Sequence, residues 1–516
     1  MSDYDVLVIG AGHNGLACAA YLARAGYHVG VFEQQDVVGG AVVTREIIPG
    51  FRFDLGGSVP NSINLAPIID ELKLKEYGYE DVFLDPQFFC PYPDGSHLFL
   101  WRDVDRTCES IAALSDHDAE AYRRYARDWQ PLLRVIVDAM NHSPSPFNLA
   151  RTLGGGFLTR VHAPLRMAGL LAKSSAALMQ TYFSNPKVRA AINWTGIQSG
   201  VGIDEPFGAM TAAWHLTYHL AGMSHARGGA GALTQAMARV ITDHGGEVHT
   251  NCRVAAILSR GKQAAGIRLQ DGSTVSAARV VSAIHIRTTL GLLDEAVVPA
   301  RKKIERLDLG NGSGMAVRLA LSELPDYAAL PGQPGPQHTA LQWICPDLDY
   351  ARRAHADFLS GRVSTDPLLG AMTFSAADPT LAPPGRHTLF LWGQYYPYEL
   401  ADGRDWDDLR EQAADRLLDK LAEYAPNVRS AVIGRFIETP PDLERMFGLH
   451  RANITHLPMD ARHMFMLRPV PEYSQYHGPL KGLYISGAST HPRGGITGQP
   501  GRNTARVILQ DLARKP

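Results

Sequence analysis

The sequence predicts an α/β protein in which a sheet of parallel strands, contributed by separate segments of the chain, is interleaved with an α+β region. Three features predict it: a strand, glycine-rich turn and helix at the N-terminus, a similar segment in the middle, and a last strand before a glycine-rich loop near the C-terminus. The 516 residues are 45% hydrophobic and 20% charged, with a net charge of −2. This composition is typical of a globular protein of about two or three domains and argues against a dedicated nucleic-acid binder.

The N-terminal segment contains a complete dinucleotide-binding pattern. Within residues 4–33, an apolar strand precedes the turn GAGHNG, and a helix and a second strand ending in an acid follow it. In this Rossmann-type pattern Gly10 makes the tight turn, Gly12 lets a pyrophosphate approach, and Gly15 lets the helix pack on the strand. Glycines that serve only the turn are the alternative, but the full context favours a nucleotide site.

The residues after the second strand favour FAD. Glu33 ends that strand, where its carboxylate can accept hydrogen bonds from ribose hydroxyls and would repel the 2′-phosphate of NADP. The doublet Gly39-Gly40 extends the cradle along a cofactor longer than NAD needs. Asn14 and Ala41 lie beside these glycines and complete the N-terminal set of candidate cofactor-binding residues.

The middle of the chain is predicted to return to the same domain. A helix at residues 232–244 leads to a strand at residues 247–254, then to a hairpin and a buried strand at residues 280–283. In flavoproteins with a glycine doublet, a strand like the first of these meets the adenine through its backbone. Val254 is therefore a candidate adenine contact.

The C-terminal loop is predicted to hold the flavin ring. A strand at residues 483–486 ends in a small-residue turn, and residues 494–501 begin the last helix, at residues 502–512. Backbone N–H groups at a helix start suit an electron-rich acceptor such as a flavin carbonyl. The candidate flavin-binding residues all lie in this loop: Gly487, Ala488, Gly495, Ile496 and Thr497.

These elements divide the chain into two interleaved domains. Residues 1–70, 225–300 and 470–516 are predicted to form a discontinuous FAD-binding domain, and residues 71–224 and 301–469 a substrate or cap domain. The first substrate block is predicted to be mostly helical. The second alternates like sheet and contains an amphipathic helix over residues 406–424. Its apolar face consists of Leu409, Ala413, Leu417 and Leu421.

Residues 139–203 contain no Asp or Glu and form a candidate membrane-facing segment. Basic residues alternate here with apolar ones: Arg151, Arg160, Arg166, Lys173, Lys187 and Arg189. A basic, apolar helical segment can rest on an anionic membrane surface and admit a lipid-soluble substrate. The alternatives are a cap helix with a solvated basic face and a contact within a homo-oligomer.

The sequence also predicts a compartment. Its five cysteines are far apart and contain no C-x-x-C pair, which indicates a reducing environment. The N-terminus enters a strand without the pattern of a signal peptide. Residues 206–226 are uncharged but contain three histidines, which makes them a poor transmembrane helix. We expect a cytoplasmic protein, either free or bound peripherally to one membrane face.

His215 and His219 are four residues apart, on one face of a predicted helix. A metal site would need further ligands, which the pattern does not supply, so no metal is expected. A polar spot lining a pocket is the preferred interpretation.

The motifs together resemble the phytoene desaturase-like flavoprotein superfamily. The resemblance rests on residues 4–57 and on ARGGAGALTQAM, LRPVPEYSQY and GLYISGASTHPRGGITGQPGRN, and it extends over nearly the whole chain. Within this superfamily, the chain most resembles the flavin-dependent carotenoid ketolases and the phytoene dehydrogenase-related oxidoreductases. The resemblance implies an FAD-dependent desaturase, dehydrogenase or ketolase acting on an apolar, isoprenoid or carotenoid-like substrate. Because no second GxGxxG follows a strand, oxygen or a quinone is the expected electron acceptor.

Two other functions stay open at this point. One is a flavin amine oxidase of the same fold, with Tyr473, Tyr476 and Tyr484 as aromatic walls. No cysteine follows Cys345 to anchor a flavin near the C-terminus, so the FAD is predicted to be non-covalent. The other is a flavoprotein with a binding or chaperone-like role and no turnover.

The candidate catalytic residues are Arg493 and His491. Members of the superfamily have small residues after the His-Pro pair, whereas this chain has Arg493. Its guanidinium could stabilise an anionic reduced flavin or bind an acidic group of the substrate, with a solvent-facing side chain as the alternative. His491 could relay a proton near neutral pH or make a structural hydrogen bond.

Overall fold

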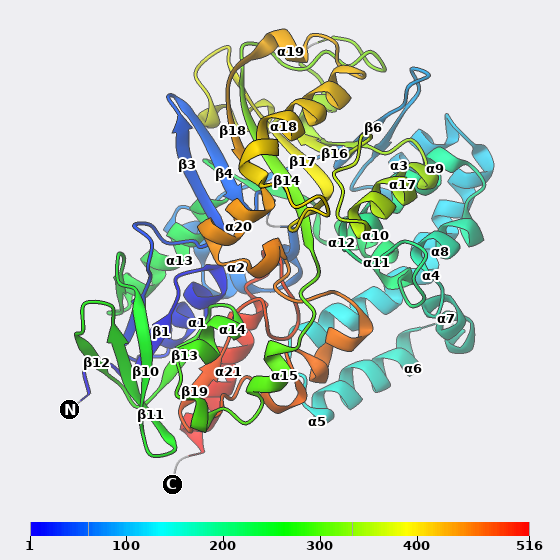
Figure 1. Ribbon diagram of the computed structural model, residues 1–516. Helices are drawn as coiled ribbons and strands as arrows, with labels where there is room; N and C mark the ends of the chain where they lie inside the picture. The colour runs from blue at the N-terminus through cyan, green and yellow to red at the C-terminus, as the bar shows by residue number, and fades with distance from the viewer. Residues whose placement is uncertain (1, 60, 162, 333, 515–516) are drawn as a thin grey trace.

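Two large sheets, three smaller ones and a block of helices make up the described part of the structure. It is a computed structural model that describes residues 2–514 apart from positions 60, 162 and 333. In Figure 1 the parallel sheet lies at the lower left near both termini, the larger sheet at the top, and the helical block on the right. The α/β fold class predicted from the sequence is confirmed.

The parallel sheet has five strands in the order β19-β13-β1-β2-β9. Four of these strands are buried along their whole length, as in parallel sheets covered on both faces, whereas the edge strand β9 is partly exposed. They are β1 (Val6–Ile9), β2 (Val29–Phe32), β9 (Glu247–His249), β13 (Val280–Ser282) and β19 (Leu483–Ile485). All of them lie within the three segments predicted for the FAD-binding domain.

Three helices pack beside this sheet: α1 (His13–Arg24), α13 (Gly231–Asp243) and α21 (Gln499–Ala513). The first and last helices of the chain pack closely because Gly501 has no side chain. A Cβ on Gly501 would lie 2.0 Å from the carbonyl oxygen of Asn14. The C-terminal helix is thereby held directly against the N-terminal nucleotide motif.

The rest of the parallel-sheet region consists of short elements. The antiparallel hairpins are β3 (Val42–Ile48) with β4 (Phe51–Gly56), and β10 (Val254–Arg260) with β11 (Gln263–Leu269) and β12 (Thr274–Ser276). The prediction of one continuous strand over residues 247–254 is wrong. The chain is interrupted at Asn251, which adopts a φ of 55° and separates β9 from β10. The last helix begins at Gln499 rather than at residue 502, since Gly498 has a φ of 64° and Pro500 suits a first helical turn.

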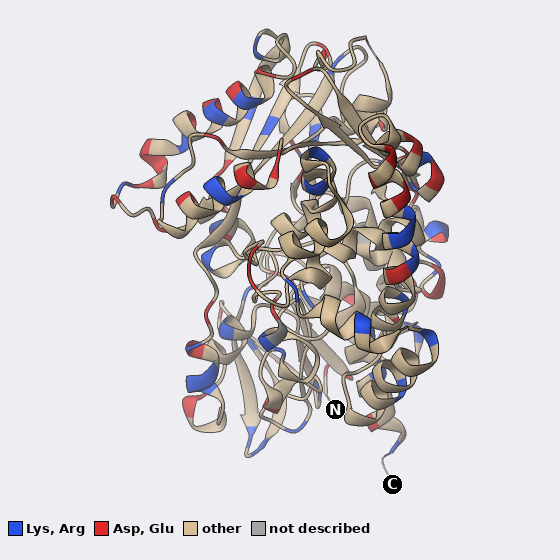
Figure 2. Ribbon diagram, turned by 90° about the vertical axis from the view of Figure 1, so that its right-hand side faces the viewer, with Lys and Arg blue, Asp and Glu red and all other residues tan. Residues whose placement is uncertain are grey.

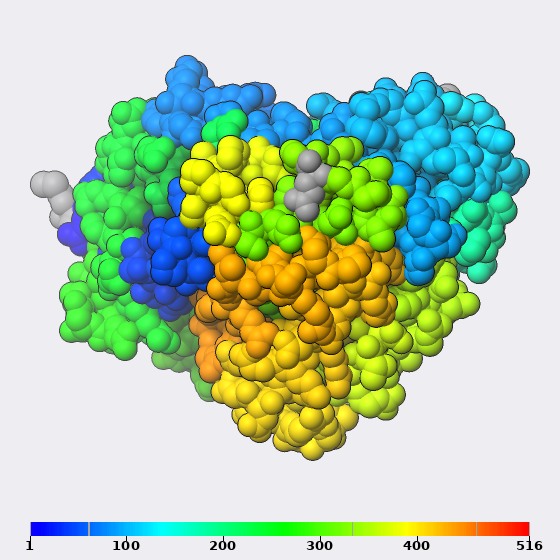
Figure 3. All heavy atoms as spheres, turned by 90° about the horizontal axis from the view of Figure 1, so that it is seen from above, coloured from blue at the N-terminus to red at the C-terminus, as the bar shows by residue number. Residues whose placement is uncertain are grey.

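The second sheet has seven strands in the order β18-β14-β17-β16-β15-β6-β7. They are β6 (Phe88–Pro91), β7 (His97–Leu100), β14 (Gly312–Leu321), β15 (Leu341–Ile344), β16 (Leu368–Met372), β17 (His387–Pro397) and β18 (Val432–Glu438). The amphipathic helix predicted for residues 406–424 is observed as α18 (Trp406–Ala422). Its predicted apolar face is buried: Leu409, Ala413, Leu417 and Leu421. Seen from above, the yellow and orange segments of this region lie between the green and blue region on the left and the cyan helices on the right (Figure 3).

The helical block supplies one wall of the interior. It comprises α3 (Val104–Ala112), α4 (Asp116–Met140), α5 (Pro146–Leu149), α6 (Gly156–Arg160), α7 (Pro164–Leu171), α8 (Ser175–Tyr182), α9 (Pro186–Ile192), α10 (Trp194–Gln198), α11 (Ala209–Ala213), the 3₁₀ turn η4 (Trp214–Leu216) and α12 (Thr217–Ala221). Figure 2 views this block face on and shows charged residues along its outer turns, with mainly tan ribbon toward the centre. None of the helices described is long and apolar enough to cross a bilayer.

The two histidines of the helical block have a structural role. The hydroxyl of Tyr122 lies 2.9 Å from Nε2 of His215 and 2.7 Å from Nε2 of His219. The pocket prediction for this pair is wrong, because neither residue is among those that line the central cavity. Within the described residues, no group of three or more His, Cys, Asp or Glu is arranged to hold a metal.

Candidate active site

The N-terminal glycines form a cradle with open space above it. Gly10 has a φ of 91°, and a Cβ on Gly15 would lie 2.1 Å from the Gly10 carbonyl oxygen, so both are fixed by the turn. A Cβ on Gly12 would meet nothing within 4 Å. Gly12 also forms a parallel bridge with Gly39 of the glycine doublet. The open side of Gly12 is where the predicted pyrophosphate would approach the backbone.

Glu33 and the second glycine of the doublet complete the cradle. The Glu33 carboxylate is buried and accepts hydrogen bonds from the backbone N–H groups of Ala11 (2.8 Å) and Gln35 (2.9 Å). A Cβ on Gly40 would come within 3.2 Å of the Gly12 Cα, so the two loops approach as closely as glycine permits. Two bonds fix the carboxylate and leave it further lone pairs for ribose hydroxyls.

The buried side-chain oxygen of Asn14 lacks a hydrogen-bond partner among the described residues. Burying a polar atom without a partner is unfavourable, so an orphaned oxygen here points to a ligand group that donates to it. The backbone N–H of Cys252 donates to the Glu33 carbonyl oxygen at 2.7 Å, which ties the segment before the buried Val254 to the cradle. The residues present fit an extended dinucleotide.

A cavity of about 780 Å³ lies next to the cradle. Its walls come from both glycine-rich loops, the helical block and the seven-stranded sheet. Aromatic side chains dominate the part formed by the sheet and helices: Phe157, Trp194, Trp214, Trp343, Phe390 and Trp392. Six of the residues singled out from the sequence line it: Ala41, Ala488, His491, Arg493, Gly495 and Ile496.

The C-terminal loop closes the cavity against the N-terminal motif. Gly487 turns the chain with a φ of 88°, and a Cβ on Gly494 would lie 2.4 Å from the Thr455 Cα. Nε2 of His13 lies 3.0 Å from the carbonyl oxygen of Gly495, so the two glycine-rich loops meet directly. Thr497 is buried behind this contact. The predicted flavin ring would lie beside this junction.

His13 and His456 both line the cavity, although neither was predicted from the sequence. His13 stands inside the GAGHNG motif, where attention to the variable positions could have found it. His456 lies in a loop without a recognisable pattern, and its Nδ1 is 3.1 Å from the Ser489 Oγ. Burial lowers the pKa of His13 to about 4 and the pKa of His456 well below its usual value. Both imidazoles are therefore neutral at neutral pH.

His491 is also held as a neutral imidazole. Its Nε2 lies 3.4 Å from the carbonyl oxygen of Ala139, and burial lowers its pKa to about 3. This geometry supports the structural hydrogen bond over a relay that passes through a charged imidazolium at neutral pH. A role of His491 in proton transfer stays a prediction.

Arg468 was also missed, although it lies within the LRPVPEYSQY motif. Its guanidinium is fully buried and donates to the backbone carbonyl oxygens of Thr455 and Ala488, both at 2.7 Å, and of Thr490 at 3.2 Å. Burial lowers its pKa to about 9, so the side chain stays charged at neutral pH. Arg468 fixes the loop of His456 against the turn that follows β19.

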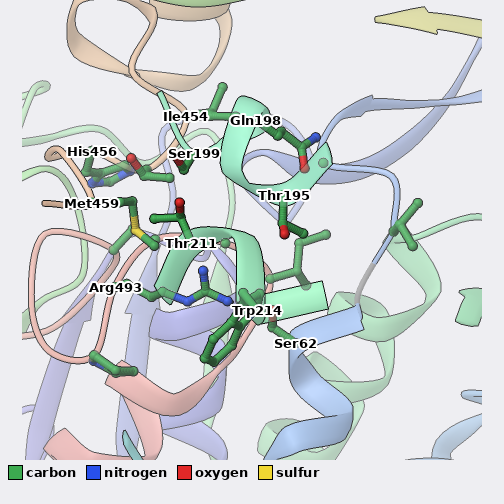
Figure 4. A pocket seen from close by; sticks show the side chains of 18 of the residues that line it. Ser62, Thr195, Gln198, Ser199, Thr211, Trp214, Ile454, His456, Met459 and Arg493 are labelled. Carbon is green, nitrogen blue, oxygen red and sulfur yellow. Dashed lines mark hydrogen bonds between the residues drawn. The ribbon is translucent and has the colours of Figure 1, made fainter. Parts of the chain in front are cut away.

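Arg493 lies in the cavity wall rather than in solvent. Its Nη2 donates to the Ser62 Oγ at 3.2 Å, and its guanidinium carbon lies 4.3 Å from the centre of the Trp214 ring (Figure 4). Its Nε is buried without a hydrogen-bond partner among the described residues. Burial lowers its pKa to about 10, so it is a cation at neutral pH. The site combines a nucleotide cradle, an aromatic cavity and one cationic side chain.

Comparison with known proteins agrees with this geometry. The chain is 34% identical to rat pyridine nucleotide-disulfide oxidoreductase domain-containing protein 2, over 99% of this chain and 94% of the relative. It is 28% identical to a limonene dehydrogenase polypeptide of Castellaniella defragrans (98% and 95% covered) and 26% identical to 4,4'-diaponeurosporene oxygenase of Staphylococcus aureus (95% and 95%). The resemblance to phytoene desaturase-like flavoproteins is confirmed.

A solved structure of an oxidoreductase from Methanosarcina mazei has the same fold, with a TM-score of 0.62 at 20% identity and coverage of 98% of this chain and 99% of that one. The family model described as flavin containing amine oxidoreductase matches residues 15–509. The chain therefore belongs to the flavin-containing amine oxidoreductase family and is an FAD-dependent oxidoreductase.

Proposed function

We propose that the protein oxidises an apolar, isoprenoid-like molecule, by dehydrogenation or oxygenation, and passes the electrons to oxygen or a quinone. The observation that carries the proposal is the aromatic and aliphatic lining of the cavity beside the flavin cradle. Apolar walls of this kind hold a hydrocarbon chain by removing its surface from water. The similarity to the limonene dehydrogenase polypeptide supports the same substrate class.

The side chains of the site have separate tasks. FAD, when bound, supplies the hydride-accepting chemistry. The aromatic walls orient the substrate and exclude water. The buried charge of Arg468 stands directly behind the turn at Ala488 and favours negative charge on that side of the cavity. The neutral His13 holds the two glycine-rich loops together through the carbonyl of Gly495.

The amine oxidase alternative is disfavoured by the charge of the cavity. Among the described residues that line it, Arg493 is the charged one at neutral pH, and no Asp or Glu is present. A protonated amine would be repelled by this guanidinium and would find no carboxylate to bind. The other alternative, a flavoprotein that binds its ligand without turnover, is distinguished from an oxidase by the mixing experiment described next.

Anaerobic mixing tests the proposal. Purified protein should be yellow and should release its flavin on mild denaturation, as expected for non-covalent FAD. Farnesol, a polyene hydrocarbon and an aliphatic amine are then mixed separately with the loaded protein, while the flavin absorbance is followed. We expect bleaching by an isoprenoid and its reversal by oxygen or a quinone. Bleaching only by the amine would establish amine oxidation instead, and no bleaching by any compound would favour a binding role.

The basic segment over residues 139–203 is part of the same proposal. It contributes Leu153, Phe157 and Leu171 to the cavity, while Leu165 next to them is 90% exposed and Leu158 is 77% exposed. Large exposed apolar side chains beside basic ones suit insertion into an anionic membrane surface. An apolar substrate could then pass from the bilayer into the cavity.

Vesicle binding tests this membrane contact. We expect the protein to bind phosphatidylserine vesicles roughly tenfold better than neutral ones, and the preference to weaken as salt screens the charges. The double change Leu158→Glu and Leu165→Glu should abolish binding, whereas Leu359→Glu, which alters another exposed leucine (71% exposed), should not. Equal binding to both vesicle types, or none, would favour the cap-helix interpretation. Dimerisation that the double change disrupts would favour the oligomer contact.

A further inference from the structure

The guanidinium of Arg493 is a half-buried cation in the cavity wall that no carboxylate among the described residues compensates. Two other arginines lie beside a carboxylate, since Arg318 is 2.9 Å from a Glu438 oxygen and Arg502 is 2.6 Å from a Glu71 oxygen, and Arg468 donates to several backbone carbonyl oxygens. Arg493 has one hydrogen bond to a serine and one aromatic face, and among the described residues no carboxylate pairs with it. Removing a cation from water without an anionic partner is costly, so an anion from outside the chain is expected beside it.

The surroundings of Arg493 form a polar end of the cavity. Ser62 accepts one N–H, and the Trp214 ring supports the guanidinium face (Figure 4). Thr211 comes from the helical turn before Trp214, and the Thr195 hydroxyl donates to the neighbouring Ala212 carbonyl, so both hydroxyls belong to the same wall. The Nε–H of the guanidinium has no hydrogen-bond partner among the described residues, and it can donate to an incoming carboxylate.

The sheet side of the cavity is apolar. Its lining there comes from Trp343 on β15, Met372 on β16, and Phe390 and Trp392 on β17. A ligand that satisfies both ends has a long apolar chain and one anionic end group. A single arginine matches the single charge of a carboxylate better than the several charges of a diphosphate.

We propose that the substrate is an amphipathic carboxylic acid, whose carboxylate is bound by Arg493 and Ser62 while its isoprenoid or alkyl chain occupies the aromatic part of the cavity. The inference rests on the proposed oxidation of an apolar substrate and narrows its class. It predicts that the arginine in the His-Pro-Arg sequence sets substrate preference. A stabilising contact with the reduced cofactor is the competing role.

Equilibrium binding to the FAD-loaded protein tests the inference with three probes: farnesoic acid, farnesol and methyl farnesoate, which share one chain. We expect the wild type to bind the acid at least tenfold more tightly than the alcohol or the ester between pH 6 and 8. Arg493→Met should weaken binding of the acid by roughly 10- to 100-fold, which is the range for loss of a charge-assisted hydrogen bond. It should weaken binding of the two neutral probes by less than about twofold. Arg493→Lys should retain part of the preference for the acid over the neutral probes. Ser62→Ala should bind the acid a few-fold more weakly than the wild type does.

The outcomes separate this inference from the broader proposal. Equal affinity of the wild type for all three probes, tighter binding of farnesyl diphosphate than of the acid, or equal weakening of every probe in Arg493→Met would overturn it. A shift in the flavin midpoint potential with unchanged acid preference would assign Arg493 to the cofactor and also overturn it. If the wild type binds none of the probes, the apolar substrate itself is refuted. Arg386→Met, at an exposed position outside the cavity lining, is the matched control. If Arg493→Met does not fold, the affinities of Arg493→Lys and Ser62→Ala for the acid decide.

Discussion

Replacing Gly12 by valine is expected to leave the protein folded and to abolish FAD loading. The backbone at Gly12 has φ −67° and ψ 163°, an extended conformation that any residue can adopt. Its Cβ would meet no protein atom within 4 Å, so the protein itself leaves room for the valine side chain. That room is the space the pyrophosphate needs. We expect affinity for FAD to fall on the order of 100-fold or more, measured as flavin absorbance per protein after reconstitution.

Two further glycines make the test specific. Gly291→Val introduces the same side chain where nothing lies within 4 Å, at the exposed end of a short helix, and should load FAD normally. Gly15→Ala should instead destabilise the fold, because its Cβ would lie 2.1 Å from the Gly10 carbonyl oxygen. A Gly12→Val protein that binds FAD as the wild type does would show that the pyrophosphate lies elsewhere.

The cofactor region could be predicted because its information is local. Gly10, Gly12 and Gly15 are separated by fixed short spacings that encode one turn and one helix start, and Glu33 ends the neighbouring strand. The boundaries that were wrong lie at Asn251 and Gly498, where single residues of positive φ end or start an element. Propensity alone does not predict which Asn or Gly will adopt that conformation.

The cavity could not be predicted to the same degree because its walls come from distant segments. His13 reaches the carbonyl of Gly495 across nearly the whole chain, and His456 meets Ser489 only after the loops have packed. Helical spacing placed His215 and His219 on one face but could not say that Tyr122 covers that face. The position of Arg493 likewise depends on Trp214, which no spacing relates to it.

Acidification is expected to unfold the protein below about pH 5. Burial lowers the pKa of His215, His285 and His491 to about 3 and of His13 to about 4. In the unfolded chain each would titrate near its ordinary value of about 6.5. Between these values the unfolded state binds more protons than the folded state, so the free energy of unfolding falls as the pH falls.

The buried acids Asp54 and Glu438 act in the opposite direction, because burial raises their pKa and a proton then favours the folded state. They offset part of the histidine effect. Each fully buried histidine contributes up to about 1.4 kcal/mol per pH unit below pH 6.5, so His215, His285 and His491 together contribute up to about 4 kcal/mol per unit, a large part of the stability of a typical domain.

Urea unfolding between pH 7.5 and 4.5 measures this dependence. We expect the free energy of unfolding to be nearly constant above pH 7, to fall increasingly steeply below pH 6, and to vanish near pH 5. His215→Gln should lower the free energy of unfolding at pH 7, because it removes the hydrogen bond to Tyr122. It should also reduce the number of protons taken up on unfolding by up to one, which makes the pH dependence of stability shallower. His28→Gln, at an exposed position, is the matched control for the substitution itself. A free energy of unfolding that stays constant from pH 7 to 5 would mean that these imidazoles can take up protons without leaving the folded core.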